Sequence, residues 1–394
     1  MASHLCSPRS SLPATGRSHP FNNANTFKND VRALFAGCAC RLTFVVSRLT
    51  FPLPQPPFAP RLSYFPRARL GHFPTPLEPL PRLTQTLGGP TLWVKRDDVV
   101  GPAMGGNKTR KLEFLFGEAQ AQGATAVATF GGLQSNFARQ MAAGARALGL
   151  EPHCFYFVPR PKKLEGNLLL NELMGARLHF IPFGQSDDSS MTLEQSVRLV
   201  RLVARLRPSC WGKRLYFMPV GGHTPVGCLG YVLAAMEIEE QLRERGVEQA
   251  TVVTAVGTGG TLAGLMAGFH LLKSKHTVLG IDVGKLWRAF PASIASLASE
   301  VCALLGEPRA FTTADVPIVE RTYVGQAYAQ PTPESQEAMR LAARTEGLIL
   351  DPVYSSKAMA GLMDLARSGQ GRWKAGEQVV FLHTGGLPAL WAGL

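Results

Sequence analysis

Residues 105–113 (GGNKTRKLE) combine the residue types best suited to chemistry in this chain. Two glycines let the backbone approach a ligand, and Lys108 follows where helical spacing begins. Arg110, Lys111 and the positive end of that helix all disfavour a protonated amine on Lys108. A deprotonated lysine can form a Schiff base. The alternative is a solvated basic helix start. A nucleotide-binding P-loop is excluded, because Asn107 and not glycine precedes the lysine.

A second glycine-rich segment, residues 256–261 (VGTGGT), follows an apolar run and opens another predicted helix. Backbone N–H groups at such a helix start bind phosphate, with help from threonine hydroxyls. The segment lacks the GxGxxG spacing of dinucleotide sites. It therefore favours a monophosphate ligand, although a tight strand-to-helix turn would use the same glycines.

Three further polar turns contain candidate ligand contacts. Residues 131–139 place Ser135 and Asn136 at a helix start, where each residue type serves equally well as an N-cap. Tyr354 follows as an acid–base candidate or a buried tyrosine, and Thr384 as a ligand contact or a helix cap. We interpret His223 and His383 as loop or core histidines. These candidates lie in the segments GGLQSNFAR, DPVYSS and HTGGL.

Alternating short apolar runs and helical patterns must position these turns. The predicted strands cover residues 91–95, 125–130, 153–158, 177–181, 215–218, 251–256, 278–283 and 378–383. The predicted helices cover residues 108–122, 136–148, 167–173, 193–206, 226–244 and 261–272. This alternation predicts an α/β fold with parallel sheets covered by helices on both faces. Ligands of such sheets bind at the carboxyl ends of the strands, where the polar turns lie.

Composition sets the class of protein. The chain has 394 residues, of which 45% are hydrophobic and 18% charged, and 40 are glycine, as expected of a globular α/β protein. The net charge of +13 raises the possibility of nucleic-acid binding, but the basic residues are scattered. We expect an enzyme that attracts anionic ligands, with no nucleic-acid partner. The 7 cysteines are odd in number and form no CxxC pair, so we expect neither a disulfide framework nor a metal site.

The first sixty residues differ from the rest, because they are rich in Ser, Pro and Arg and contain Asp30 as their only acid. This composition fits a transit peptide, a disordered extension or translation from an upstream start codon. We therefore expect residues 1–61 to form an N-terminal extension outside the fold. No apolar run is long enough to span a membrane, and the expected location is cytoplasmic, or organellar if the extension is a transit peptide.

From about residue 62 onward the motifs together resemble the aminocyclopropane-carboxylate deaminase and D-cysteine desulfhydrase family. The resemblance is carried by FPRARLGHFPTPLEPLPRL, KRDD, GGNKTRKLE, GGLQSN, PVGG, VGTGGTLAGL, YVGQAYAQPTPE, DPVYSSKAMAGL and HTGGLPALW, in that order. It implies a pyridoxal-phosphate enzyme with two open, twisted, mainly parallel sheets, like the tryptophan synthase β subunit (fold type II). It further implies a larger cofactor-binding domain of residues 62–110 and 219–394, a smaller α/β domain of residues 111–218, and a homodimer.

The resemblance also assigns roles to residues. Lys108 is the expected Schiff-base lysine, Asn136 lies near the phenolic oxygen of the cofactor, and Ser135 lies near the substrate carboxylate. Tyr328 and Tyr354 are the expected acid–base or positioning groups. The groups expected to hold the phosphate are Lys111, Gly257, Thr258, Gly259, Gly260 and Thr261.

Two positions indicate the reaction. Deaminases of this family carry Glu after the tyrosine of DPVY and Leu before the final Gly-Gly, whereas this chain has Ser355 and Thr384. A carboxylate beside the pyridine nitrogen keeps it protonated and makes the ring a strong electron sink, and a hydroxyl does not. The hydroxyls therefore favour β-elimination from D-cysteine. His223, where serine is more common, and the positive charge keep L-cysteate open as an alternative substrate, followed by 1-aminocyclopropane-1-carboxylate.

Overall fold

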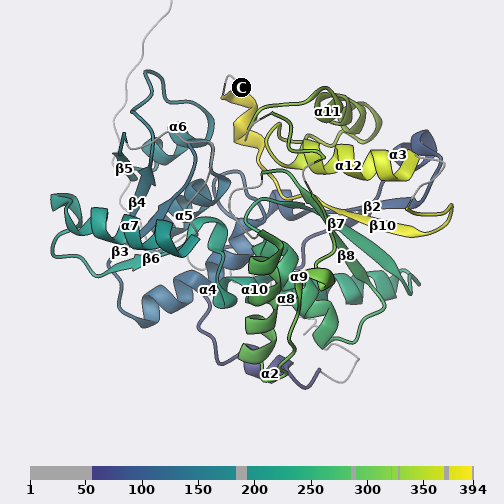
Figure 1. The fold of residues 1–394 in the computed structure, drawn as a ribbon, viewed down its shortest axis with the longest axis horizontal. Helices are drawn as coiled ribbons and strands as arrows, with labels where there is room; N and C mark the ends of the chain where they lie inside the picture. The colour runs from purple at the N-terminus through teal and green to yellow at the C-terminus, as the bar shows by residue number, and fades with distance from the viewer. Residues whose placement is uncertain are drawn as a thin grey trace, which may run out of the picture. The chain divides into compact units, whose positions relative to one another are not determined.

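Two sheets organise the fold, with the four-stranded sheet at the left of Figure 1 and the six-stranded sheet at the right. The computed structural model describes residues 56–182, 193–284, 290–320, 322–326, 329–367 and 372–392. All of them belong to one unit, Gln55–Leu394.

The six-stranded sheet is parallel except for its first strand, which pairs antiparallel with the second. In spatial order its strands are β1 (Leu77–Pro79), β2 (Thr91–Lys95), β10 (Gln378–Leu382), β7 (Ala250–Val256), β8 (Thr277–Asp282) and β9 (Ile318–Val319). Successive side chains of a strand point to opposite faces. Accordingly, Val252 packs in one hydrophobic cluster and Val253 in another.

Helices cover both faces of this sheet. The cluster of Val252 contains residues of α8 (Pro225–Glu244), α9 (Gly260–Leu271) and α10 (Phe290–Leu304). The cluster of Val253 contains residues of α3 (Pro81–Leu87), α11 (Pro333–Glu346) and α12 (Ser355–Arg367). Burial on both faces explains why the central strands are almost uniformly apolar.

The four-stranded sheet is parallel throughout, in the order β5 (Arg177–Phe180), β4 (Glu151–Tyr156), β3 (Ala126–Phe130) and β6 (Leu215–Phe217). On one face it packs against α4 (Lys108–Ala121), α5 (Asn136–Ala147) and α6 (Gly166–Leu173). Val200 and Ala204 of α7 (Leu193–Arg205) share a cluster with Phe217 of β6 on the other face. The remaining elements are α2 (Ala59–Leu62), η1 (Asp97–Val99), η2 (Pro208–Cys210), η3 (Val220–Gly222), η4 (Thr313–Asp315) and η5 (Leu387–Trp391).

The predicted fold class is confirmed, and each predicted strand and helix has a counterpart within a few residues. Several elements were not predicted: β1, β9, α3, α10, α11 and α12. β1 and β9 have three and two residues, too few for a recognisable alternation, and exist through pairing with β2 and β8.

The N-terminal boundary needs a correction. Residues 56–61, expected to belong to the extension, are part of the folded unit, because α2 lies there and Phe58 is buried in the core. The division of the remaining chain into two domains stays a prediction. Among the described residues, no helix is long and apolar enough to cross a membrane.

Candidate active site

Lys108 begins α4 at the end of a loop in which two positions require glycine. Gly105 and Gly106 have φ values of 60° and 131°, and a Cβ at Gly106 would lie 2.4 Å from Gln140 Nε2. Gln140 Oε1 accepts a hydrogen bond from the Thr109 amide at 2.9 Å. One residue earlier on α5, Arg139 donates to the carbonyl of Gly105 at 2.9 Å. The second helix of the smaller sheet therefore fixes the turn that presents Lys108.

The Lys108 amine has the electrostatic surroundings of a neutral base. Burial lowers its pKa well below the ordinary value, the Lys111 cation lowers it further, and the Cys228 thiol acts in the opposite direction. Within the described part of the chain, the amine makes no hydrogen bond or ion pair. A lysine in this state is a nucleophile toward a carbonyl group.

Lys111, one turn further along α4, is a fully buried cation, and no carboxylate of the described residues lies beside it. Its amine donates a hydrogen bond to the carbonyl of Gly221 at 3.0 Å. A Cβ at Gly260 would lie 2.8 Å from the same amine, so Lys111 points at the first turn of α9. Burial lowers the pKa of Lys111 to about 8. An anion bound at this place would offset the unfavourable burial of the charge.

The loop before α9 supplies the other half of an anion site. Gly259 is the N-cap of α9 with a φ of 83°, and a Cβ there would meet Ile294 at 2.4 Å. The Thr258 hydroxyl is buried and has no hydrogen-bond partner among the described residues. The Thr261 hydroxyl accepts from Asn107 Nδ2 at 3.2 Å, which ties this loop to the lysine turn. An unpartnered hydroxyl, a helix N-terminus and a buried lysine fit the phosphate of pyridoxal phosphate.

Tyr354 and Thr384 reach the same loops from the last part of the chain. A Cβ at Gly257 would lie 3.2 Å from Cε1 of Tyr354, so the tyrosine ring lies against the phosphate loop. The carbonyl of Thr384 accepts a hydrogen bond from the amide of Asn107 at 3.1 Å. The structure thus brings these two residues beside the turns of Lys108 and α9.

Ser135 and Asn136 have local roles at the start of α5. The Ser135 hydroxyl accepts from the amide of Ala138 at 3.2 Å and is the N-cap of the helix. Asn136 Oδ1 accepts from Asn167 Nδ2 at 2.9 Å. Their contacts with cofactor and substrate stay predictions, as do all assigned roles in the site. Tyr328 lies outside the described residues.

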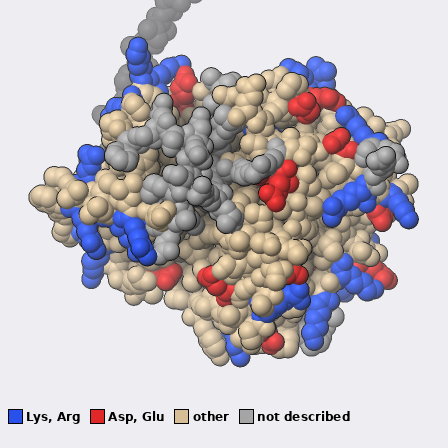
Figure 2. Space-filling model, viewed as in Figure 1, with Lys and Arg blue, Asp and Glu red and all other residues tan. Residues whose placement is uncertain are grey.

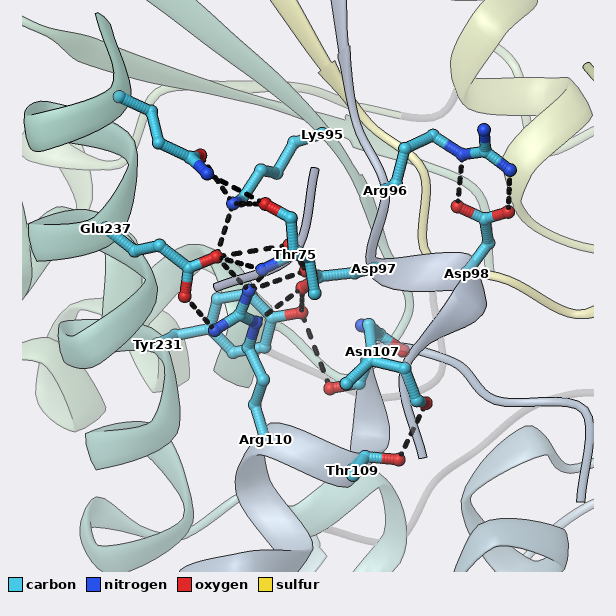
Figure 3. A network of polar contacts seen from close by, with 12 residues as sticks. Thr75, Lys95, Arg96, Asp97, Asp98, Asn107, Thr109, Arg110, Tyr231 and Glu237 are labelled. Atoms are coloured by element: carbon cyan, nitrogen blue, oxygen red, sulfur yellow. Dashed lines mark hydrogen bonds and ion pairs between the residues drawn. The ribbon is translucent and has the colours of Figure 1, made fainter. Parts of the chain in front are cut away.

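A buried network of ions behind the lysine turn was not predicted (Figure 3). Arg110 binds Asp97 through two hydrogen bonds of 2.8 Å and binds Glu237 at 2.9 Å. Tyr231 donates to Asp97 Oδ2 at 2.8 Å and lies 3.4 Å from the carbonyl of Asn107. Lys95 contacts Glu237 from the end of β2. The network joins β2, α4 and α8, and through Tyr231 it reaches Asn107, the residue before Lys108. In the sequence, Lys95 and Asp97 belong to KRDD and Arg110 to GGNKTRKLE, but nothing there indicates that they meet.

The comparisons with known proteins define the class. Residues 68–385 match the family model described as "Pyridoxal-phosphate dependent enzyme". A fungal L-serine ammonia-lyase from Rhizomucor miehei shares the fold, with a TM-score of 0.53 over 80% of this chain and 95% of that one at 18% identity. The chain is therefore a pyridoxal-phosphate dependent enzyme of fold type II, as expected.

More similar proteins narrow the family. Two are putative 1-aminocyclopropane-1-carboxylate deaminases, each 37% identical. The protein of Pyrococcus abyssi aligns over 84% of this chain and 94% of its own length, and that of Pyrococcus furiosus over 83% and 93%. A solved structure of an ACC deaminase homologue is 34% identical, with a TM-score of 0.74 over 86% of this chain and 97% of that one. This chain belongs to the 1-aminocyclopropane-1-carboxylate deaminase family.

Proposed function

We propose that this enzyme catalyses β-elimination on a small sulfur amino acid, with D-cysteine as the first candidate and pyruvate, hydrogen sulfide and ammonia as products. One observation carries the catalytic part of the proposal. The amine of Lys108, whose pKa is lowered by burial and by the Lys111 cation, lies one helical turn from Lys111. Lys111 is buried, and its own amine points at the first turn of α9. That pair suits a lysine-bound cofactor whose phosphate lies at Lys111.

Different residues would bind the cofactor, transfer the proton and position the leaving group. Lys111, the Thr258 hydroxyl and the N-terminus of α9 would hold the phosphate. When bound, pyridoxal phosphate supplies an electron sink for the charge left on the α-carbon of the substrate. Lys108 Nζ would take the proton from that α-carbon, a role that its lowered pKa favours. Tyr354, against the phosphate loop, would position the leaving group.

The substrate assignment depends on Ser355 and Thr384. Ser355 is fully buried, donates its hydroxyl to Asp351 Oδ1 at 2.5 Å and accepts from the Asp351 amide at 2.7 Å. The side chain at this position is therefore neutral and fixed in place, where deaminases of the family carry glutamate. Expulsion of a thiol needs less electron withdrawal than opening a cyclopropane ring. The names of the Pyrococcus relatives support the deaminase as an alternative.

Parallel assays separate the candidate substrates. Ammonia release is measured from D-cysteine, L-cysteate and 1-aminocyclopropane-1-carboxylate, with Lys108→Ala as the control for reactions of free cofactor. We expect D-cysteine to give the highest kcat/KM, with hydrogen sulfide and pyruvate as co-products. Turnover of cysteate alone would move the assignment to a sulfo-lyase, and preference for the cyclopropane substrate would contradict the argument from Ser355.

The predicted homodimer and cytoplasmic location remain part of this proposal. On the face shown in Figure 2, Lys and Arg side chains lie in separate groups around the rim, with Asp and Glu among them. Among its described residues, this face therefore shows no continuous basic surface of the kind that nucleic acid needs. Light scattering on the purified enzyme tests the dimer.

A further inference from the structure

Three side chains that commonly bind metals meet in the four-stranded sheet. They are His153 on β4, His179 on β5 and Cys210 on η2, and all three are buried. His153 Nδ1 lies 3.1 Å from His179 Nε2 and 3.4 Å from Cys210 Sγ. One ligand atom from each residue lies within 4.8 Å of the other two.

Nδ1 of His153 is shared between two neighbours in this cluster. A ring nitrogen carries either one proton or one lone pair, so Nδ1 of His153 can make a good hydrogen bond with only one of its two neighbours. A tetrahedral zinc ion places two ligand nitrogens about 3.4 Å apart and a nitrogen and a sulfur about 3.6 Å apart. The distances in the cluster, 3.1 Å between the two nitrogens and 3.4 Å between nitrogen and sulfur, are close to these values. A small outward shift of the three ligand atoms would therefore accommodate the ion.

The surroundings of the cluster resemble the support that metal-binding histidines receive. Glu151 Oε1 lies 3.2 Å from His153 Nε2, at ion-pair distance although the angle is not that of a hydrogen bond. A carboxylate on this side favours the proton on Nε2 and leaves the Nδ1 lone pair for a metal. Phe155 stacks on the His179 ring, with centroids 4.3 Å apart. Of the nearby cations, Lys213 and Arg177 are paired with Glu151, and Arg207 lies close enough to act on His179 and Cys210.

Cys210 also provides a path for entry. It lines a cavity of about 660 Å³ together with Arg201, Lys213 and Phe217. An ion can reach the thiol from this cavity, and a water molecule there can occupy a fourth ligand position. Sites with three protein ligands and one water are common for zinc.

We propose that His153 Nδ1, His179 Nε2 and Cys210 Sγ bind one zinc ion, with water from the cavity as the fourth ligand. On binding, the thiol proton of Cys210 leaves to solvent and a sulfur–zinc bond replaces the S–H bond. The ion links β4, β5 and η2, so its role is to stabilise this edge of the smaller sheet. The absence of a CxxC pair does not bear on such a site, because its ligands come from three separate elements.

Zinc content of the untagged, full-length holoenzyme tests the proposal. The protein is dialysed against a chelator, returned to micromolar zinc chloride, desalted and analysed by mass spectrometry. Wild type should retain one zinc per chain, and Cys210→Ser and His179→Gln should lose it. Cys302→Ser is the matched control, because Cys302 is also a buried thiol, on α10 and outside the cluster. Zinc should raise the melting temperature of wild type and Cys302→Ser only.

X-ray absorption at the zinc edge of the wild-type protein identifies the ligands directly, so this test does not depend on the variants. We expect one sulfur and two imidazole ligands in the wild-type spectrum. Oxygen ligands alone, no zinc retained by wild type, or equal zinc in Cys210→Ser would overturn the proposal. Circular dichroism and cofactor absorbance show which variants are folded, and a variant that fails to fold leaves the wild-type spectrum to decide.

Discussion

Among the described residues, Lys111 is a buried lysine with no acidic side chain beside it. Its amine donates a hydrogen bond to the carbonyl of Gly221, and burial lowers its pKa from 10.5 to about 8. At about 1.4 kcal/mol per pKa unit, the charged amine destabilises the folded apoprotein by about 3 kcal/mol. The arrangement is reasonable only if an anion normally lies there.

The apoprotein should therefore become more stable as the pH rises through the pKa of Lys111. In the window between about 8 and 10.5 the unfolded chain binds more protons at this lysine than the folded one, so the free energy of unfolding increases with pH. The melting temperature of the apoprotein is compared with that of Lys111→Met across this window. The melting temperature of the wild type should rise with pH relative to that of the variant, and added pyridoxal phosphate should make this rise smaller.

Lys275→Met is the control for this experiment, because Lys275 is an exposed lysine paired with Glu248. Its pH profile should follow that of wild type. If the melting temperatures of wild type and Lys111→Met changed with pH in parallel, Lys111 would not be a buried charge without a compensating anion.

At the scale of residues, the sequence predicted the candidate site residues but not the residues whose hydrogen bonds hold them in place. Lys108 and Lys111 stand out because of the glycines and the helix start around them. Arg139 and Asn107 do not, since their hydrogen bonds to Gly105 and Thr261 join segments far apart in the chain. Ser135 is ambiguous in sequence for a physical reason, because its hydroxyl caps α5 whatever else it contacts.

At the scale of elements, the ion network of Figure 3 holds α4 against α8 and β2. Arg110→Met would leave Asp97 and Glu237 buried with Lys95 as their remaining cation. Breaking a buried ion pair from one side costs about 3–5 kcal/mol. We expect a loss of that size in urea unfolding, together with weaker cofactor retention, since Arg110 lies in the first turn of α4 and Tyr231 contacts the carbonyl of Asn107.

Arg243→Met is the matched control, because Arg243 also pairs with a glutamate, Glu240, on the surface of α8. Its unfolding curve should match that of wild type. Equal unfolding curves for both variants and wild type would show that the network does not stabilise the fold.

The elements that sequence patterns predicted are those that carry their own periodicity. The parallel strands β7 and β10 are continuous apolar runs, and α4 and α5 have helical spacing. α12 was missed because its start, DPVYSS, has the composition of a polar turn. In the structure the Asp351 carboxylate accepts hydrogen bonds from the amides of Val353, Tyr354 and Ser355, and these bonds fix the start of α12.

At the scale of the molecule, the folded unit begins near residue 55, earlier than the sequence predicted. Removal of residues 1–55 should leave activity and stability unchanged, because the family match begins at residue 68 and the candidate site lies after residue 104. Removal of residues 1–61 also deletes Phe58, which is 1% exposed. Loss of a buried phenylalanine costs about 3–5 kcal/mol.

Urea unfolding and steady-state turnover of the two truncated proteins provide the comparison. The shorter deletion should behave as wild type and the longer one should unfold at lower urea. Loss of activity on removal of residues 1–55 would mean that the first residues contribute to catalysis.

The central claim is that Lys108 carries the cofactor, and one measurement tests it directly. The protein is reconstituted with pyridoxal phosphate, reduced with borohydride to fix the cofactor to its lysine, digested and analysed by mass spectrometry. The account predicts the label on the peptide that contains Lys108, and its disappearance in Lys108→Ala. A label on Lys111 or on another lysine, or no specific label in the wild type, would contradict it.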